Sequence, residues 1–145
     1  KRDNISRHFC CFFVPLHTPT NSTYLVHHIK ADGWIPPGGH IDPDETPEST
    51  VTREFQEELS FKLTDEVMSL FNISPVYIEH PKTCVVHYDF WYTVLCKEQT
   101  PFVYEKKEFH DAGWFPIEKA IQMVKRDNEK NMLKKIKKLY LSSPV

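Results

Sequence analysis

The chain has 145 residues, of which 40% are hydrophobic, and a formal net charge of −2. This length and composition predict one globular domain covering residues 1–145. The small net charge argues against a nucleic-acid partner, and no apolar run approaches the roughly 18 residues of a membrane span. Both a monomer and a homodimer stay open.

The four cysteines are spaced neither as a zinc site nor as a C-x-x-C redox pair. They are Cys10, Cys11, Cys84 and Cys96. Each lies in an apolar run typical of a strand. We therefore expect reduced, buried thiols in a cytoplasmic protein.

Two strands and one helix are predicted in the first part of the chain. Residues 8–14 and 23–29 are rich in aromatic and β-branched residues, which favour strands. Further on, Thr46 is a good N-cap, with Pro47 at the first helical position. The predicted helix runs from Pro47 to about Leu59.

The second part predicts further strands and two helices. Residues 73–78 and 83–96 read as strands, 97–113 as a polar loop, and 114–124 as a strand end followed by a helix. Residues 128–141 form an amphipathic helix. Its apolar face comprises Met132, Leu133, Ile136, Leu139 and Tyr140. Because strands and helices mix without regular alternation, we expect an α/β fold with helices packed on a mixed sheet.

The helix at 47–59 carries an unusual stripe of acidic residues. Helical periodicity places Val51, Phe55 and Leu59 on a buried stripe. It places Glu54, Glu57 and Glu58 together on a neighbouring one. Like charges at this spacing repel, and only Arg53 is near enough in sequence to offset them. A solvated helix face is the ordinary alternative, but a hard divalent cation would turn the repulsion into attraction.

The spacing resembles the signature of the Nudix hydrolase family, G-x5-E-x7-R-E-U-x-E-E-x-G-U, where U is bulky and apolar. The matching positions are Gly39, Glu45, Arg53, Glu54, Phe55, Glu57, Glu58 and Phe61. Such a match is far more specific than a lone glycine-rich motif. One position departs, because Ser60 replaces the final glycine. We expect a left-handed residue there, at a cost of about 1 kcal/mol for serine.

The resemblance implies a Nudix-type α/β/α sandwich, with a mixed β-sheet and the Nudix loop and helix. It also implies hydrolysis of a nucleoside diphosphate linked to a further group X. Water attacks a phosphorus of the pyrophosphate, and Mg²⁺, or alternatively Mn²⁺, neutralises the phosphate charge.

By position, the resemblance assigns metal binding to Glu54, Glu57, Glu58 and the backbone carbonyl of Gly38. One of these carboxylates, or Glu108 in a later loop, would act as the general base. Arg53 would brace the site by pairing with Glu45 or Glu57. All these positions are implied by the family pattern.

Candidate substrate contacts lie on both sides of the signature. Gly39 and His40 would face a phosphate, although a surface histidine beside a turn is equally consistent. Trp34 would stack on a base or serve as a core aromatic. His87 and Asp89 alternate on one face of a strand, where they either face the substrate cleft or form a satisfied polar pair.

The substrate itself is a small nucleotide. The signature is most similar to compact MutT-type enzymes, which predicts cleavage of a nucleoside triphosphate to monophosphate and pyrophosphate. Trp91 would add a stacking surface for the base. Pro75 keeps an ADP-ribose pyrophosphatase open as an alternative, and Tyr77 a diadenosine polyphosphate hydrolase.

Two other classes of function occur on similar folds. An isomerase resembling isopentenyl diphosphate isomerase would use a cysteine and a different glutamate set. A non-catalytic nucleotide-sensing module would normally lack some carboxylates of the signature. Because every charged position is present, the sequence favours the hydrolase.

Overall fold

The computed structural model of the chain describes residues 5–79 and 84–141. Its centre is a seven-stranded sheet. The strands are β1 (Ile5–His17), β2 (Ser22–His28), β3 (Gly33–Ile35), β4 (Gly38–His40), β5 (Val67–Glu79), β6 (Cys84–Leu95) and β7 (Phe109–Pro116). The helices are α1 (Pro47–Leu59), α2 (Ile117–Met123) and α3 (Asp127–Tyr140), with a 3₁₀ turn, η1, at Thr18–Thr20.

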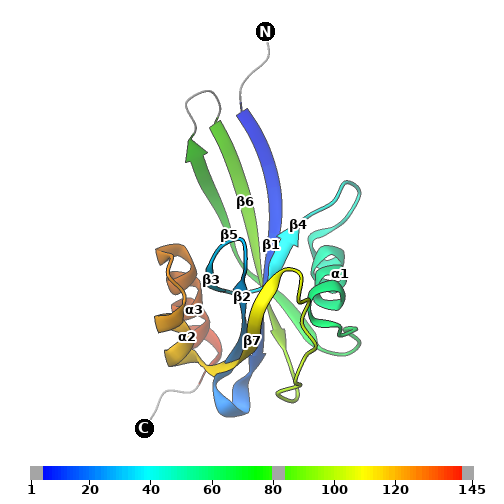
Figure 1. Ribbon diagram of the computed structural model, residues 1–145, viewed down its shortest axis with the longest axis vertical. Helices are drawn as coiled ribbons and strands as arrows, with labels where there is room; N and C mark the ends of the chain where they lie inside the picture. Colours follow the sequence, from blue (N-terminus) through cyan, green and yellow to red (C-terminus); the bar gives the residue numbers. More distant parts are fainter. Residues whose placement is uncertain (1–4, 80–83, 142–145) are drawn as a thin grey trace.

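The sheet lies between two helical layers. Its strand order is β3-β2-β1-β6-β5, with β4 added to β1 and β7 to β2. β1 and β6 run parallel, whereas the other named pairs are antiparallel. Helix α1 packs on one side, and α2 and α3 lie on the other (Figure 1). The predicted α/β/α sandwich with a mixed sheet is confirmed.

Strand β1 contributes to a hydrophobic core on each face of the sheet. Cys11 and Phe13 pack in the cluster that contains the apolar side of α1. Val14 and Leu16 pack in the cluster under α2 and α3. Alternate residues of a strand point to opposite faces, so a central strand covered on both sides is apolar throughout. The predicted stripe of α1 is fully buried, at 0% exposed for Val51, Phe55 and Leu59.

Helix α1 begins and ends as its sequence predicts. The Thr46 hydroxyl accepts the Ser49 N–H (3.1 Å), and the Ser49 hydroxyl accepts the Thr46 N–H (3.0 Å). Pro47 occupies the first turn, where its missing N–H costs nothing. Ser60 ends the helix in the left-handed conformation, with φ 53° and ψ 38°, and donates its N–H to the Gln56 carbonyl. This φ angle confirms the conformation expected from the family glycine.

The sheet divides into two parts beyond the turn that joins β1 and β2. These strands pair at only two positions, Leu16 with Thr23 and His17 with Ser22. One part then contains β4, β1, β6 and β5, and the other contains β3, β2 and β7. A cleft opens between the two parts and is lined from both.

Several predicted boundaries need correction. The predicted loop 97–113 contains the first half of β7, and the short strands β3 and β4 lie where no strand is predicted. β7 carries exposed polar residues, His110 and Asp111, but it pairs with β2 along its length. Tertiary pairing therefore outweighs the weak intrinsic strand propensity of this segment.

One residue of the predicted apolar face of the last helix is not buried. Leu139 is 58% exposed, whereas Met132, Leu133 and Ile136 are buried. In the last turn, Tyr140 contacts the sheet instead, with its hydroxyl 3.2 Å from the Thr93 hydroxyl.

The cysteines with described side chains agree with the prediction of reduced thiols. Cys10 and Cys11 are buried and free, and Cys96 is free and half-buried. The side chain of Cys84 lies outside the described residues. Among the helices of the described residues, none has the length and apolar character to cross a membrane.

Candidate active site

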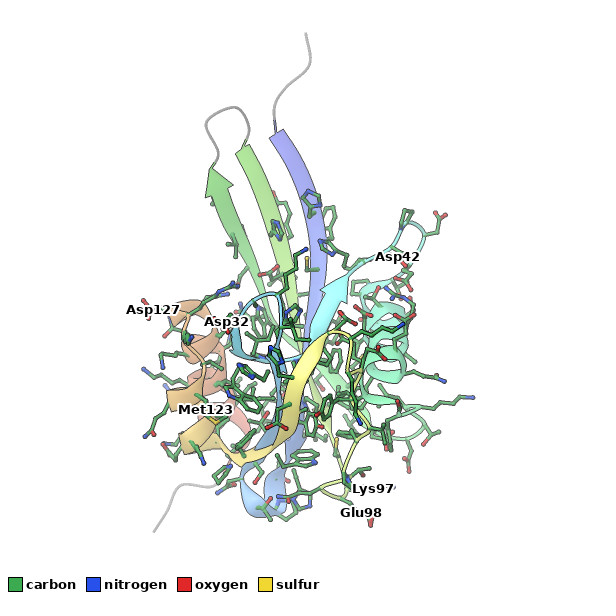
Figure 2. The ribbon with its side chains drawn as sticks, viewed as in Figure 1. Asp32, Asp42, Lys97, Glu98, Met123 and Asp127 are labelled. Carbon is green, nitrogen blue, oxygen red and sulfur yellow. The ribbon has the colours of Figure 1, made fainter. Side chains whose placement is uncertain are left out.

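The candidate site is the cleft between the two parts of the sheet, with a volume of about 420 Å³. One end is formed by Glu54 and Glu58 of α1. The other end includes Asp89 of β6 and Arg126 beside α3. Figure 2 shows the two flanks, with Asp42 on the loop before α1 and Asp127 at the start of α3, across the sheet. We name these two groups of polar lining residues the first, or α1, end and the second, or β6–α3, end of the cleft.

Two glycines allow α1 to approach the sheet at the first end. Strand β4 pairs with β1, and Gly39 lies opposite Cys11. A Cβ on Gly39 would lie 1.5 Å from Oε2 of Glu54, and a Cβ on Gly38 would lie 2.2 Å from the Cys11 carbonyl oxygen. Any side chain at position 39 would therefore displace the glutamate. Close approach, with φ negative at both, accounts for these glycines.

Arg53 holds the loop and the helix together. Its guanidinium donates two hydrogen bonds to Glu45, at 2.7 and 3.0 Å, and one to the His40 carbonyl at 3.1 Å. It also contacts Glu57 at 3.0 Å and Glu54 at 3.3 Å. The hydrogen bonds from Arg53 and the Asp42 backbone lower the pKa of Glu45 to about 2. The predicted bracing contacts to Glu45 and Glu57 are both present.

The two cleft-facing glutamates carry more negative charge than their surroundings neutralise. Glu58 is 3% exposed, and its Oε1 has no hydrogen-bond partner. Burial, then the charges of Glu54 and Glu108, raise the pKa of Glu58 to about 9. Burial and a hydrogen bond with Glu57 raise the pKa of Glu54 to about 7, against the opposing charge of Arg53. Crowded, buried carboxylate oxygens with a free lone pair fit a hard divalent cation.

Glu57 and Glu108 occupy different positions relative to this pair. Glu57 does not line the cleft, and its side chain is 58% exposed beside Arg53. Glu108 is exposed and lines the cleft. Its turn is fixed to α1, because the Glu105 N–H donates to the Glu58 carbonyl at 2.9 Å. The fold therefore brings the later-loop glutamate to the helix glutamates.

The second polar end contains a buried acid in strand β6. Asp89 is 6% exposed, and its Oδ1 has no hydrogen-bond partner. Burial raises the pKa of Asp89 to about 6, while the charge of Arg126 opposes the shift. Cys10, His87 and Asp89 present ligand atoms within 4.8 Å of one another. The predicted alternative of a satisfied polar pair does not hold for Asp89.

The remaining predicted contacts are divided between cleft and core. Gly39 and His40 line the cleft. Trp34 does not; it stacks on His27 at 5.1 Å and packs against the α2–α3 core. Trp91 is 1% exposed and stacks on Phe12, so it offers no free face to a base in this conformation.

His87 and Asp89 line the cleft, which is the first of the two alternatives predicted for them, whereas Arg126 is not among the predicted residues. Asp89 has one signal, since it is the single acid within the long apolar strand of residues 84–95. Arg126 has none, because it follows the short helix α2 and reaches the cleft only through tertiary packing.

Residues 11–139 match the model of the NUDIX domain family. The chain belongs to the NUDIX family. The matched range contains every element from β2 to α2, and with them both ends of the cleft. The resemblance inferred from the signature at residues 39–61 is therefore confirmed.

This NUDIX chain has named relatives in sequence and structure. It is 28% identical, over 116 residues, to the dihydroneopterin triphosphate diphosphatase of Haemophilus influenzae, which covers 72% of this chain and 70% of that protein. The E. coli dihydroneopterin triphosphate pyrophosphohydrolase has a TM-score of 0.77 at 13% identity, covering 91% of this chain and 94% of that one. A C. elegans Ap4A hydrolase has a TM-score of 0.65 at 16% identity, covering 92% and 96%. At such identities the structural likeness shows the fold alone.

Proposed function

We propose that this NUDIX protein is a magnesium-dependent pyrophosphohydrolase that converts a nucleoside-triphosphate-like substrate into a monophosphate and pyrophosphate. The family and the Haemophilus influenzae relative support pyrophosphohydrolase chemistry, and the substrate in that relative's name is a triphosphate. The cleft of about 420 Å³ lies within the range of ligand pockets, about 300–1,000 Å³.

The observation that carries the proposal is the crowded Glu54–Glu58 pair against Gly39, with an unpartnered, buried Oε1 on Glu58. Magnesium takes oxygen ligands and keeps several waters, so few protein ligands suffice. Glu54, Glu57, Glu58 and the Gly38 carbonyl would hold it, with manganese as the substitute. Bound there, it would neutralise phosphate charge and polarise the phosphorus.

The remaining residues of this end would position the substrate and move one proton. Gly39 and His40 would lie along the phosphates, and Arg53 would keep the loop and helix in register. The water oxygen bonds to the α- or the β-phosphorus, and the bond from that phosphorus to the oxygen bridging the two breaks. Pyrophosphate leaves after attack on the α-phosphorus and the monophosphate leaves after attack on the β-phosphorus, while the water proton passes to a carboxylate. Glu108, which is exposed and whose charge helps to raise the pKa of both Glu54 and Glu58, is our candidate acceptor.

Direct competition between substrates tests this function. We expect triphosphates to exceed ADP-ribose and diadenosine tetraphosphate by more than tenfold in kcat/KM. Reaction in ¹⁸O-labelled water then locates the attacked phosphorus, because the label enters the monophosphate when the phosphorus next to the nucleoside is attacked. A preference above tenfold for ADP-ribose or a dinucleotide would overturn the triphosphate assignment.

A further inference from the structure

Asp89 is a buried acid that the proposed chemistry at α1 does not use. Asp89 is only 6% exposed, and its Oδ1 has no hydrogen-bond partner. The residue lines the cleft. Leaving a buried polar oxygen unpaired costs free energy, and most such groups in proteins are satisfied. A ligand that donates hydrogen bonds would remove this cost. The oxygen is therefore available for recognition inside the cleft.

Asp89 lies about one nucleoside length from His40, which we propose lies along the phosphates. In the sheet, His40 of β4 pairs with Cys10 of β1, and Cys10 pairs with Asp89 of β6. These three residues form one row across neighbouring strands. Two strand spacings separate its ends by about 10 Å. That separation is comparable to the length of one nucleoside.

The apolar part of the cleft lining suits a flat ring. Phe12, Val26, Ile35, Val76 and Phe109 line the cleft. Phe12 is itself held by Trp91, with ring centroids 4.7 Å apart and an interplanar angle of 19°. An apolar cleft with one polar group at its end is the usual form of a site that orients a heterocycle.

A cation is the competing occupant, because Cys10 and His87 lie beside Asp89. Metal binding by cysteine requires the thiolate. Burial, then the charge of Asp89, raise the pKa of Cys10 to about 11, so a cation bound there would first have to displace the thiol proton. An organic ligand needs no such deprotonation.

We infer that Asp89 selects the base of the substrate by accepting hydrogen bonds from two adjacent N–H groups. That donor pair is the 2-amino-4-oxopyrimidine edge, which guanine and pterins share. Adenine presents an acceptor beside a donor on the corresponding edge, and hypoxanthine lacks the amino group. The inference rests on the proposed function for the placement of the phosphates.

Nucleotide binding in chelator tests the selection without hydrolysis. Calorimetry would compare GMP, IMP and AMP, and separately the unphosphorylated pair neopterin and guanosine. A bidentate base contact is worth roughly 1–3 kcal/mol, so we expect GMP to bind at least ~5-fold tighter than IMP or AMP. Asp89→Asn replaces one acceptor by a donor and should remove the difference. The control is Asp111→Asn, the same substitution at an exposed residue that does not line the cleft.

The outcomes separate this inference from the function on which it rests. Equal binding of GMP, IMP and AMP by the wild-type chain would overturn it, even if Asp89→Asn does not fold. Tight Zn²⁺ binding that Asp89→Asn abolishes, without base preference, would overturn it in favour of a cation. Base preference without hydrolysis of any triphosphate would sustain it and reject the proposed function. Neopterin bound more tightly than guanosine would identify the pterin as the source of the edge.

Discussion

Both ends of the cleft contain an arginine and several acids, but the two arginines differ in how many acids they contact. At the α1 end, Arg53 lies within 4.0 Å of four carboxylates, those of Asp42, Glu45, Glu54 and Glu57. At the β6–α3 end, Arg126 reaches only Glu129, at 4.0 Å, among the described residues. Asp89 and Glu129 there each keep a buried oxygen without a partner. The α1 end also keeps one such oxygen, Oε1 of Glu58, but only at that end does an arginine tie several acids together.

The difference comes from how each end is assembled. The α1 end is built from one continuous segment, residues 38–58, where helix periodicity fixes the spacing of the acids. The other end combines β6 with the start of α3, which are distant in sequence. A locally encoded site can be ordered before ligand binding. We expect the remote one to discriminate between ligands instead of holding a cation.

Removal of divalent metal should have the largest effect. With excess chelator we expect loss of activity, because phosphate and carboxylate charges would then face each other unneutralised at the α1 end. Added Mg²⁺ or Mn²⁺ should restore turnover of the triphosphate. Full activity in excess chelator would show that the α1 end is not a metal site.

Neutralising the acids of the α1 end comes next. Glu57→Gln and Glu58→Gln should each lower kcat by about 100-fold or more, because each removes charge that would hold a cation. The fold should persist, since repulsion falls. The matched control is Glu129→Gln, also a buried acid but outside the cleft lining, for which we expect kcat to change less than ~3-fold. Near wild-type turnover in either first variant would remove that residue from the ligand set.

Two carboxylates, Glu45 of the α1 end and Asp89 of the other end, should make opposite contributions to the pH dependence of stability. The pKa of Glu45 is lowered to about 2 from 4.5, so its contribution to stability is present above pH 4.5 and is lost as pH falls towards 2. The pKa of Asp89 is raised to about 6 from 3.8, so its protonated form favours the folded state below pH 3.8, and this contribution is lost as pH rises through 6. Urea midpoints against pH should show both slopes.

Single substitutions show which residue causes each slope of the urea midpoint against pH. Glu45→Gln should flatten the acid side, and Asp89→Asn should flatten the fall between about pH 4 and 6. The same slope in Glu45→Gln and the wild type would mean that Arg53 does not stabilise that carboxylate.

The smallest effect concerns the end of helix α1. Ser60→Gly should raise stability by up to about 1 kcal/mol, or roughly 2–4 °C in Tm, because glycine has no Cβ clash at φ 53°. Asp32→Gly is the control, since Asp32 is also left-handed at φ 52° but aspartate tolerates that conformation better. A lower Tm for Ser60→Gly would show that the serine side chain stabilises the α1 end.

The same contrast decides what the sequence could predict. Helix α1, its cap, its buried stripe and the Arg53 contacts follow from residues within a few turns of one another. The family signature added the expectation about Ser60. Other features depend on contacts between distant segments, for which local propensity carries little information. These are the pairing of β7 with β2, the burial of Trp91 and the position of Arg126 in the cleft. Asp89 was visible as an isolated acid, but its missing partner was not.

The close approach of Gly39 and Glu54 couples the effects of substitutions at these two positions. Since Oε2 of Glu54 occupies the place where a Cβ at position 39 would lie, any side chain at position 39 must also move the Glu54 carboxylate. The effects of substitutions at the two positions should therefore not be additive. Random mutagenesis of codon 39 by itself would then report on both residues.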